Sequence, residues 1–134
     1  FLATPPMNLI PARLEAAGEG LALIAPGLSV QVPGAYRAAY APYTGREVIL
    51  GIRPEDLFET PEGAAPAAID CSIETVEALG PETILNVKLG QGGPELAARL
   101  PAEGDWEVAR QIRLYADSLR MHLFDPETTR KIAR

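Results

Sequence analysis

The chain is 134 residues long, and 47% of its residues are hydrophobic while 22% are charged, which is typical of one folded domain with a real core. Its formal net charge of −6 disfavours general nucleic-acid binding, because an acidic chain repels phosphate backbones. No apolar run approaches the ~18 residues that a membrane span needs, and a single cysteine excludes an internal disulfide and favours a reducing compartment.

Short stretches of alternating apolar residues, interrupted by glycine and proline, recur along the whole chain. They predict strands over residues 8–14, 21–24, 28–32, 48–52, 68–79, 83–89, 96–100, 108–115 and 119–124. The 12 glycines and 13 prolines are spread between these stretches, where they favour tight turns. Many short strands at close spacing predict an all-β sandwich or barrel.

Helical signals are weak in this sequence. Residues 36–43 are compatible with a loop or a single turn, and Pro54 favours a short helical turn over residues 54–57. Residues 60–67 contain two prolines and a glycine and are interpreted as an exposed connection. The absence of a long amphipathic pattern removes most helix-bundle and coiled-coil interpretations.

Two strands carry further detail. After Ile73 the period-two alternation of residues 68–79 slips, which predicts a β-bulge that bends the strand around a small barrel. Residues 119–124 alternate cleanly and predict a half-buried strand with Arg120, His122 and Phe124 on one face. With no nucleophile motif nearby, His122 is interpreted as a surface or edge histidine.

No residue set in the sequence assembles a catalytic, cofactor-binding or metal site. Neither lysine follows a glycine-rich phosphate loop, and the glycine cluster at residues 90–93 favours a hairpin loop. Cys71 lies in an apolar alternation and is interpreted as a small buried hydrophobe. Glu55 and Asp56 are adjacent carboxylates, and a structural ion pair with Arg53 is favoured over acid–base work.

Four motifs that are separated along the chain nevertheless resemble those of a known protein family. They are Phe-Leu-Ala-Thr-Pro-Pro-Met-Asn at residues 1–8, Leu-Gly-Ile-Arg-Pro-Glu-Asp-Leu at 50–57, Val-Glu-Ala-Leu-Gly-Pro-Glu-Thr at 76–83 and Met-His-Leu-Phe-Asp at 121–125. Their order and spacing resemble the C-terminal transport-associated OB (TOBE) domain of maltose/glycerol-3-phosphate-type ABC importer ATP-binding subunits. Asp56 departs from the family pattern, in which histidine is common.

The resemblance identifies a set of motif residues that we expect to be mainly structural: Pro6, Met7, Asn8, Gly51, Ile52, Arg53, Pro54, Glu55, Leu79, Gly80, Glu82, Thr83, His122, Leu123 and Phe124. It implies an OB-like small β-barrel with additional strands and minor helical turns. It also implies one domain over residues 1–134, with an ATPase domain upstream. The start at Phe1, without an initiator Met or a signal peptide, likewise suggests a fragment.

In function, the resemblance implies a non-catalytic dimerisation and regulatory domain at the cytoplasmic face of a bacterial membrane. The expected partners are a second copy, the transporter's membrane subunits and a possible regulatory protein. No cofactor is expected in this chain, because ATP and magnesium would bind the upstream domain. Contacts through Trp106, Tyr36, Tyr40 and Tyr43 are as compatible with packing as with an interface.

Two alternatives remain open. The first is a small-ligand sensor that binds an oxyanion or a sugar, which convergent basic groups would favour, although the arginines are scattered along the sequence. The second is a free-standing OB-fold nucleic-acid binder, which is disfavoured because eight aromatic residues on an acidic chain offer few stacking platforms.

Overall fold

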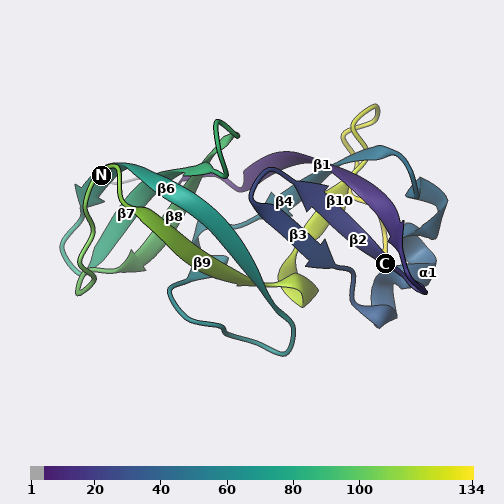
Figure 1. Cartoon of the computed structure of the whole chain (residues 1–134), viewed down its shortest axis with the longest axis horizontal. Helices are drawn as coiled ribbons and strands as arrows, with labels where there is room; N and C mark the ends of the chain where they lie inside the picture. The colour runs from purple at the N-terminus through teal and green to yellow at the C-terminus, as the bar shows by residue number, and fades with distance from the viewer. Residues whose placement is uncertain (1–4) are drawn as a thin grey trace.

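The strands curl into two adjacent lobes that share one hydrogen-bonded sheet. The computed structural model describes residues 5–134 and contains ten strands, all paired antiparallel, within that range. Figure 1 shows one lobe with β1 to β4, β10 and α1, and beside it a second lobe with β6 to β9. The predicted all-β, OB-like fold with minor helical turns is confirmed.

The first lobe combines the first half of the chain with its C-terminal segment. Its strands follow the order β10-β4-β1-β2-β3, with bounds β1 Asn8–Ala17, β2 Gly20–Ala25, β3 Leu28–Gln31, β4 Glu47–Ile52 and β10 His122–Phe124. Between β3 and β4 the chain forms the short helical segments η1 Gly34–Tyr36, α1 Arg37–Tyr40 and η2 Ala41–Tyr43. Residues 36–43 are therefore mostly helical, in agreement with the turn allowed by the sequence.

The second lobe is built from one continuous stretch. Its strands follow the order β5-β9-β6-β7-β8, with bounds β5 Leu57–Phe58, β6 Pro66–Ala78, β7 Glu82–Leu89, β8 Glu95–Pro101 and β9 Gln111–Asp117. The register of β6 against β7 shifts between Ile73 and Thr75, so the predicted bulge is confirmed. The turn predicted over residues 54–57 is the 3-10 helix η3, Pro54–Asp56, just before β5.

A strand pair and two glycines join the lobes. β3 and β6 pair at Leu28 and Ile69. Next to this pair, the Gly27 carbonyl accepts from the Asp70 amide at 3.0 Å, and the Asp70 carbonyl accepts from the Gly90 amide at 2.9 Å. A Cβ at Gly27 would lie 2.6 Å from the Asp70 oxygen, and its φ of +71° also favours glycine. The junction is thus a backbone-to-backbone contact with no room for a side chain.

Asn8 makes a second link between the lobes. Its side-chain Nδ2 donates to the Ala97 carbonyl at 2.9 Å, while its Oδ1 accepts from the Ala97 amide at 2.8 Å. The carboxamide thereby acts as the peptide group of a neighbouring strand would, on the outer edge of β8. Since Asn8 is only 8% exposed, these two bonds also satisfy a buried polar group.

Each lobe has an apolar interior that follows the predicted alternation. On β1 the residues Ile10, Ala12 and Leu14 are buried between exposed neighbours, and on β7 Leu85, Val87 and Leu89 are buried. One contiguous cluster of buried apolar side chains includes both sets. Fully burying one valine, leucine or isoleucine side chain stabilises the fold by roughly 1.5–3 kcal/mol.

Two strand predictions were partly wrong. Residues 108–110 form a turn before β9, in which Ala109 has a φ of 72° and its amide donates to the Ile73 carbonyl at 2.7 Å. Residues 118–120 form the 3-10 helix η4, Ser118–Arg120, because the Asp117 carboxylate accepts from the Leu119 amide at 3.0 Å. This side-chain cap competes with the strand, so β10 begins only at His122.

Candidate functional site

Motif residues from the beginning, middle and end of the chain meet on one face of the first lobe. β4 lies between β1 and β10, and in this register Gly51 is opposite both Leu9 and His122. A Cβ at Gly51 would lie 2.6 Å from the Met7 sulfur and 2.8 Å from Phe124 Cε2. The Met7 and Phe124 side chains therefore pack directly on the backbone of Gly51, and this close packing explains why a glycine stands in the middle of β4.

Close to Gly51, at the end of β4, Arg53 is hydrogen-bonded to His122. The Arg53 guanidinium donates to His122 Nε2 at 3.0 Å. A guanidinium can only donate, so Nε2 must carry a lone pair and the ring proton must be on Nδ1. Nδ1 is buried and has no hydrogen-bond partner among residues 5–134. The contact therefore holds His122 in its neutral form.

His122 was predicted to be a surface or edge histidine. Its strand β10 does lie at the edge of the sheet, but the surface part of the prediction was wrong, because only 9% of the residue is exposed. Burial lowers the pKa of His122 below its ordinary value of 6.5, and the positive charges of Lys131, Arg134 and Arg53 lower it further. Asp56 opposes this with a smaller effect on the same pKa. His122 is thus an uncharged acceptor in a positive local field at neutral pH.

A cleft lies next to Arg53 and His122, and basic side chains from four segments of the chain line it. Arg53 follows β4, Arg120 ends η4, His122 begins β10 and Arg134 belongs to the C-terminal segment; all four line the cleft. The arginines that are scattered in sequence are therefore convergent in the fold, contrary to the expectation from sequence. The cleft is also lined by Glu55, Asp56, Phe58 and Leu119.

The predicted ion pair of Arg53 with Glu55 or Asp56 was wrong. Asp56 instead pairs with Arg120, with 3.3 Å between Oδ1 and NH1. Within residues 5–134, neither Arg53 nor Arg134 has a carboxylate within the 4.0 Å of an ion pair. The reason is the turn at Pro54, which ends β4 and separates the Arg53 side chain from those that follow.

Arg134 is held at the cleft by contacts of its own. It donates to the Met121 carbonyl, and its guanidinium carbon lies 4.6 Å from the centroid of the Tyr36 ring. The Tyr36 hydroxyl in turn donates to the Leu119 carbonyl at 2.9 Å. Tyr36 therefore packs within this chain, which was one of the two roles, packing or an interface, that the sequence left open.

The motif at residues 76–83 lies elsewhere, at the turn between β6 and β7. Gly80 occupies this turn with a φ of +77°, and Leu79 donates to the Glu82 carbonyl at 2.8 Å. Glu82 pairs with Arg99 at 2.7 Å, and Thr83 is buried with 4% exposed.

The remaining motif residues differ in burial. Three of them are buried: Ile52, Pro54 and Leu123. Two are exposed, Pro6 and Glu55, and residues 1–4 lie outside the described range.

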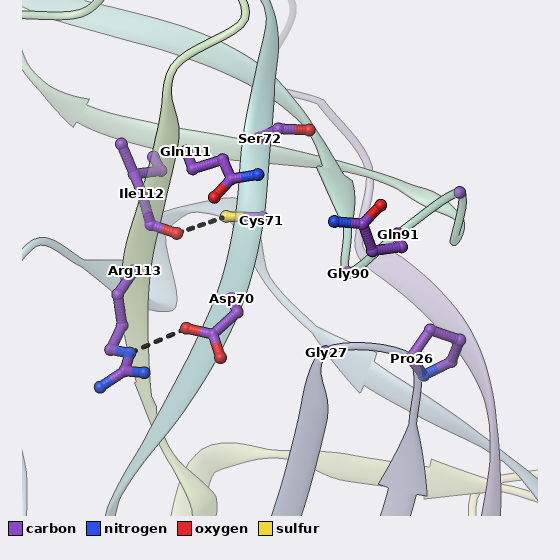
Figure 2. A pocket seen from close by; sticks show the side chains of 11 residues that line it. Pro26, Gly27, Asp70, Cys71, Ser72, Gly90, Gln91, Gln111, Ile112 and Arg113 are labelled. Atoms are coloured by element: carbon purple, nitrogen blue, oxygen red, sulfur yellow. Dashed lines mark hydrogen bonds and ion pairs between the residues drawn. The ribbon is translucent and has the colours of Figure 1, made fainter.

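A second recess lies at the junction of the lobes, between the glycine turns and strands β6 and β9. Figure 2 shows Asp70 and Arg113 on its wall, paired at 2.8 Å, and the Cys71 sulfur directed to the Ile112 carbonyl at 3.8 Å. Burial raises the pKa of the Cys71 thiol to about 11, so the thiol stays protonated at neutral pH. The interpretation of Cys71 as an inert buried group agrees with this geometry.

Among residues 5–134, no three His, Cys, Asp or Glu side chains are grouped so that they could hold a metal ion. In the part of the chain that the structure describes, no helix is long and apolar enough to cross a membrane.

The closely curled antiparallel strands, with a cleft bounded by helical turns, define an OB-type β-barrel protein. A family model described as the MalK OB fold domain matches residues 4–57, and one described as the TOBE domain matches residues 50–124. The second covers more than half of the sequence, and the chain belongs to the TOBE domain family.

Named relatives cover nearly all of the chain. It is 31% identical to the sn-glycerol-3-phosphate import ATP-binding protein UgpC of Cereibacter sphaeroides, over 98% of this chain and 34% of the relative. It is 33% identical to the sulfoquinovosyl glycerol transport ATP-binding protein SmoE of Agrobacterium fabrum, over 98% and 35%. The chain therefore spans about a third of the length of these relatives.

A solved structure of the cytoplasmic molybdate-binding protein ModG, with molybdate bound, is similar in fold. The match has a TM-score of 0.65 and covers 89% of this chain and 96% of that one. Since only 13% of the residues are identical, the likeness concerns the fold alone.

The motif residues are predictable from the sequence, but the cleft is not. The sequence pattern places Arg120 on one face of a strand and gives no sign that Arg134 is close to it. No spacing rule links residues 53, 120 and 134, because their proximity comes from the pairing of β10 with β4 and from the docking of the C-terminal segment. The unpaired state of Arg53 and the buried histidine are tertiary features of the same kind.

Proposed function

We propose that the chain is a non-catalytic dimerisation and regulatory domain of the ATP-binding subunit of a bacterial ABC importer for sugars or glycerol-phosphate-type solutes. The observation that supports this most directly is the match of 98% of the chain to about a third of importer ATP-binding proteins. The two matched family domains are an OB fold and a TOBE domain, and neither matched region contains a Gly-Lys-Ser/Thr phosphate loop.

On this proposal, ATP and magnesium bind a separate part of the parent subunit. The partners are a second copy of the subunit, the transporter's membrane-embedded subunits and a possible regulatory protein, and the location is the cytoplasmic face of the membrane. Residues 1–134 form one domain.

Two measurements on the 134-residue chain test the proposal. We expect isothermal calorimetry to detect no more ATP binding than with a control protein. We also expect light scattering to detect a concentration-dependent dimer, whose interface in the parent subunit is supported further by the rest of that protein. Micromolar ATP binding would overturn the non-catalytic role, and a strict monomer over the whole concentration range would overturn the dimerisation role of this chain.

A second candidate function is the sensing of a small ligand, an oxyanion or a sugar. The observation that favours it is the convergence of Arg53, Arg120, Arg134 and His122 on one cleft. ModG, described as molybdate-binding, shares the fold at 13% identity, which supports the capacity of such a fold to host an oxyanion site but assigns none here.

A further inference from the structure

We propose that the outer edge of β9 binds an extended peptide segment of a partner protein, which joins the sheet as a further antiparallel strand in line with β5. The segment that fits this edge alternates apolar and polar residues and carries a carboxylate at its C-terminal end. The proposal rests on the regulatory role proposed above and deepens it, because it names the surface that receives the partner and the form in which the partner binds.

The outer edge of β9 has no neighbouring strand over residues 111–114. On its inner side, β9 pairs with β6 along its whole length. On its outer side, β9 pairs with β5 only at Tyr115 and Ala116, and the chain leaves β9 after Phe58. Among residues 5–134, no other strand pairs with this side of β9.

The hydrogen bonds of Asp70 on β6 show which backbone groups of β9 point inward. The Asp70 amide donates to the Gly27 carbonyl and the Asp70 carbonyl accepts from the Gly90 amide, so both groups point away from β9. Neighbouring residues of a strand direct these groups to opposite sides, so Cys71 faces β9, where its partner is Ile112. Figure 2 shows the Ile112 carbonyl turned towards β6, at 3.8 Å from the Cys71 sulfur.

Gln111 and Arg113 flank Ile112 on β9, so their amides and carbonyls point outward, to the open side. Tyr115 has the same orientation and pairs with Phe58 of β5, which places the open side in line with β5. The two outward amides and two outward carbonyls of Gln111 and Arg113 have no backbone partner within residues 5–134. They form the pattern that an antiparallel strand recognises.

Two other edges of the sheet are covered, in contrast to this one. On β8 the carboxamide of Asn8 bonds to both backbone groups of Ala97. On β10, Phe124 forms a bridge with Lys131 of the C-terminal segment. An uncovered edge is a template for pairing with another chain, and the β9 edge keeps this capacity.

A groove of about 320 Å³ follows the open edge, and its lining indicates the side chains of the segment. Leu114 is buried, Ile112 and Trp106 are half-buried, and together they form an apolar wall. Gln111 and Arg113 line the groove as exposed polar residues. Because side chains alternate along a strand, residues opposite Leu114 and Ile112 should be apolar, and those opposite Arg113 and Gln111 should be polar.

The charged residues at the two ends of the groove give the segment a direction. Glu59, directly after β5, lines one end, and Arg110 lines the other. Neither has an ion-pair partner within residues 5–134, and the Arg110 guanidinium donates only to the Asp105 carbonyl. A segment antiparallel to β9 begins near Glu59 and ends near Arg110. An N-terminal ammonium or basic residue and a C-terminal carboxylate therefore complement the groove.

A second copy of the chain fits this edge less well. Two β9 strands that pair Gln111 with Arg113 of the other copy would bring Ala109 of that copy opposite Tyr115, where β5 already lies. Ala109 belongs to a turn that is held by the bond of its amide to the Ile73 carbonyl at 2.7 Å. A short segment that follows β5 avoids this collision.

The probe is the peptide Val-Thr-Val-Glu with a free N-terminus and an amidated C-terminus. It is titrated into the ¹⁵N-labelled 134-residue chain, and Trp106 fluorescence provides a second signal. We expect saturable shifts centred on the Gln111 and Arg113 amides with a Kd on the order of 1 mM, and slower hydrogen exchange of both amides at saturation. Thr-Val-Glu-Val, which has the same composition with the alternation shifted by one residue, should bind about fivefold more weakly or worse.

N-methylation of the peptide tests whether its backbone pairs with β9. A methyl group on the threonine nitrogen removes the donor that faces the Arg113 carbonyl, and should weaken binding by about tenfold. A methyl group on the nitrogen of the second valine, opposite Ile112, lies on the solvent side and should change the Kd by less than about twofold.

Variants of the chain locate the binding. Gln111→Pro removes an outward amide at the first residue of β9, where proline is tolerated, and should weaken binding by about fivefold or more, whereas Gln111→Ala keeps the amide and the affinity. Arg110→Gln should weaken binding by about threefold through the lost attraction to the glutamate. Arg37→Gln is its matched control, because Arg37 likewise donates to a backbone carbonyl, at Glu19, but in the first lobe. Melting curves followed by Trp106 fluorescence confirm that each variant is folded.

Four results would overturn the proposal. They are no saturable shift at peptide concentrations on the order of 10 mM, equal binding of the two peptide sequences, equal losses from the two N-methyl groups, or shifts of the Gln111 and Arg113 amides that depend on protein concentration without peptide. The last result would assign the edge to a second copy. Light scattering reports dimerisation separately: a monomer that binds the peptide contradicts only the dimerisation role, and a dimer that does not bind it contradicts only the peptide site.

Discussion

The two lobes of the sheet are built by different chain paths. The second lobe uses one stretch, β5 to β9, and its central strands β6, β7 and β8 are successive hairpins. The first lobe combines β1 to β4 with β10, so its edge forms only when a segment from the far end of the chain pairs with β4 over three residue pairs. Figure 1 shows this late strand lying within the early lobe.

This difference determines where a site can form. Hairpins in the second lobe close short loops, and their turns contain glycines with positive φ, such as Gly80 and Gly90. The first lobe brings residues 53, 120, 122 and 134 together from positions that no local structure would join. The cleft therefore depends on the long-range pairing of β10 with β4. Perturbations of that pairing should affect the cleft before they affect the second lobe.

The largest expected effect concerns Gly27, on which the junction of the lobes depends. Gly27→Ala places a Cβ at 2.6 Å from backbone atoms of Asp70 and Gly90, and φ is +71°, so we expect a loss of about 2–4 kcal/mol in the free energy of unfolding. Gly18→Ala is the matched control, because its φ is +61° but nothing lies within 4 Å of the added Cβ; about 1 kcal/mol is expected there.

Urea unfolding followed by far-UV circular dichroism and by Trp106 fluorescence measures both variants. Trp106 packs against the core from the loop between β8 and β9, so its signal reports the second lobe. Equal losses for the two variants would contradict a steric role of the junction. Separate transitions of the two signals would show that the lobes unfold independently.

The second prediction concerns Asn8, which links β1 to β8. Asn8→Ala removes both side-chain bonds and leaves the Ala97 amide and carbonyl unpaired, so we expect a loss of about 2 kcal/mol. Asn86→Ala is the control, because its side chain makes one exposed bond to Thr75 at 2.8 Å, and less than about 1 kcal/mol is expected.

Hydrogen exchange of the β8 amides provides the sharper measurement for Asn8. The amide of Ala97 should lose its protection in Asn8→Ala and keep it in Asn86→Ala, even if the global stability changes little. Retained protection at Ala97 in Asn8→Ala would mean that another group covers this edge, and the Asn8 link would then have no structural role.

Local patterns predicted the fold, while the contacts between distant segments escaped them. Alternation located every strand of the two lobes except β5, which has only two residues, and it anticipated the bulge after Ile73. It erred where a side chain overrides the strand pattern, as the Asp117 cap does at Leu119. The Arg53–His122 bond and the pairing of Asp56 with Arg120 depend on the docking of β10 and η4, which no periodicity encodes.

The smallest expected effect is the pH dependence that His122 confers. Because the folded pKa of His122 lies below the ordinary value of 6.5, the unfolded chain binds this proton at a higher pH than the folded chain. The stabilisation is complete above pH 6.5 and is lost as the pH falls from there through the folded pKa. The charged groups that act on this pKa are Lys131, Arg134, Arg53 and, in the opposite direction, Asp56.

His122→Gln isolates this contribution. The amide oxygen of glutamine can accept from Arg53 but does not titrate, so we expect urea midpoints at about pH 7.5 and pH 5.5 to differ less in the variant than in the parent chain. Carboxylates that titrate over the same range contribute equally to both proteins and cancel in the comparison. An unchanged difference between the two midpoints would assign the pH dependence to those carboxylates and not to His122.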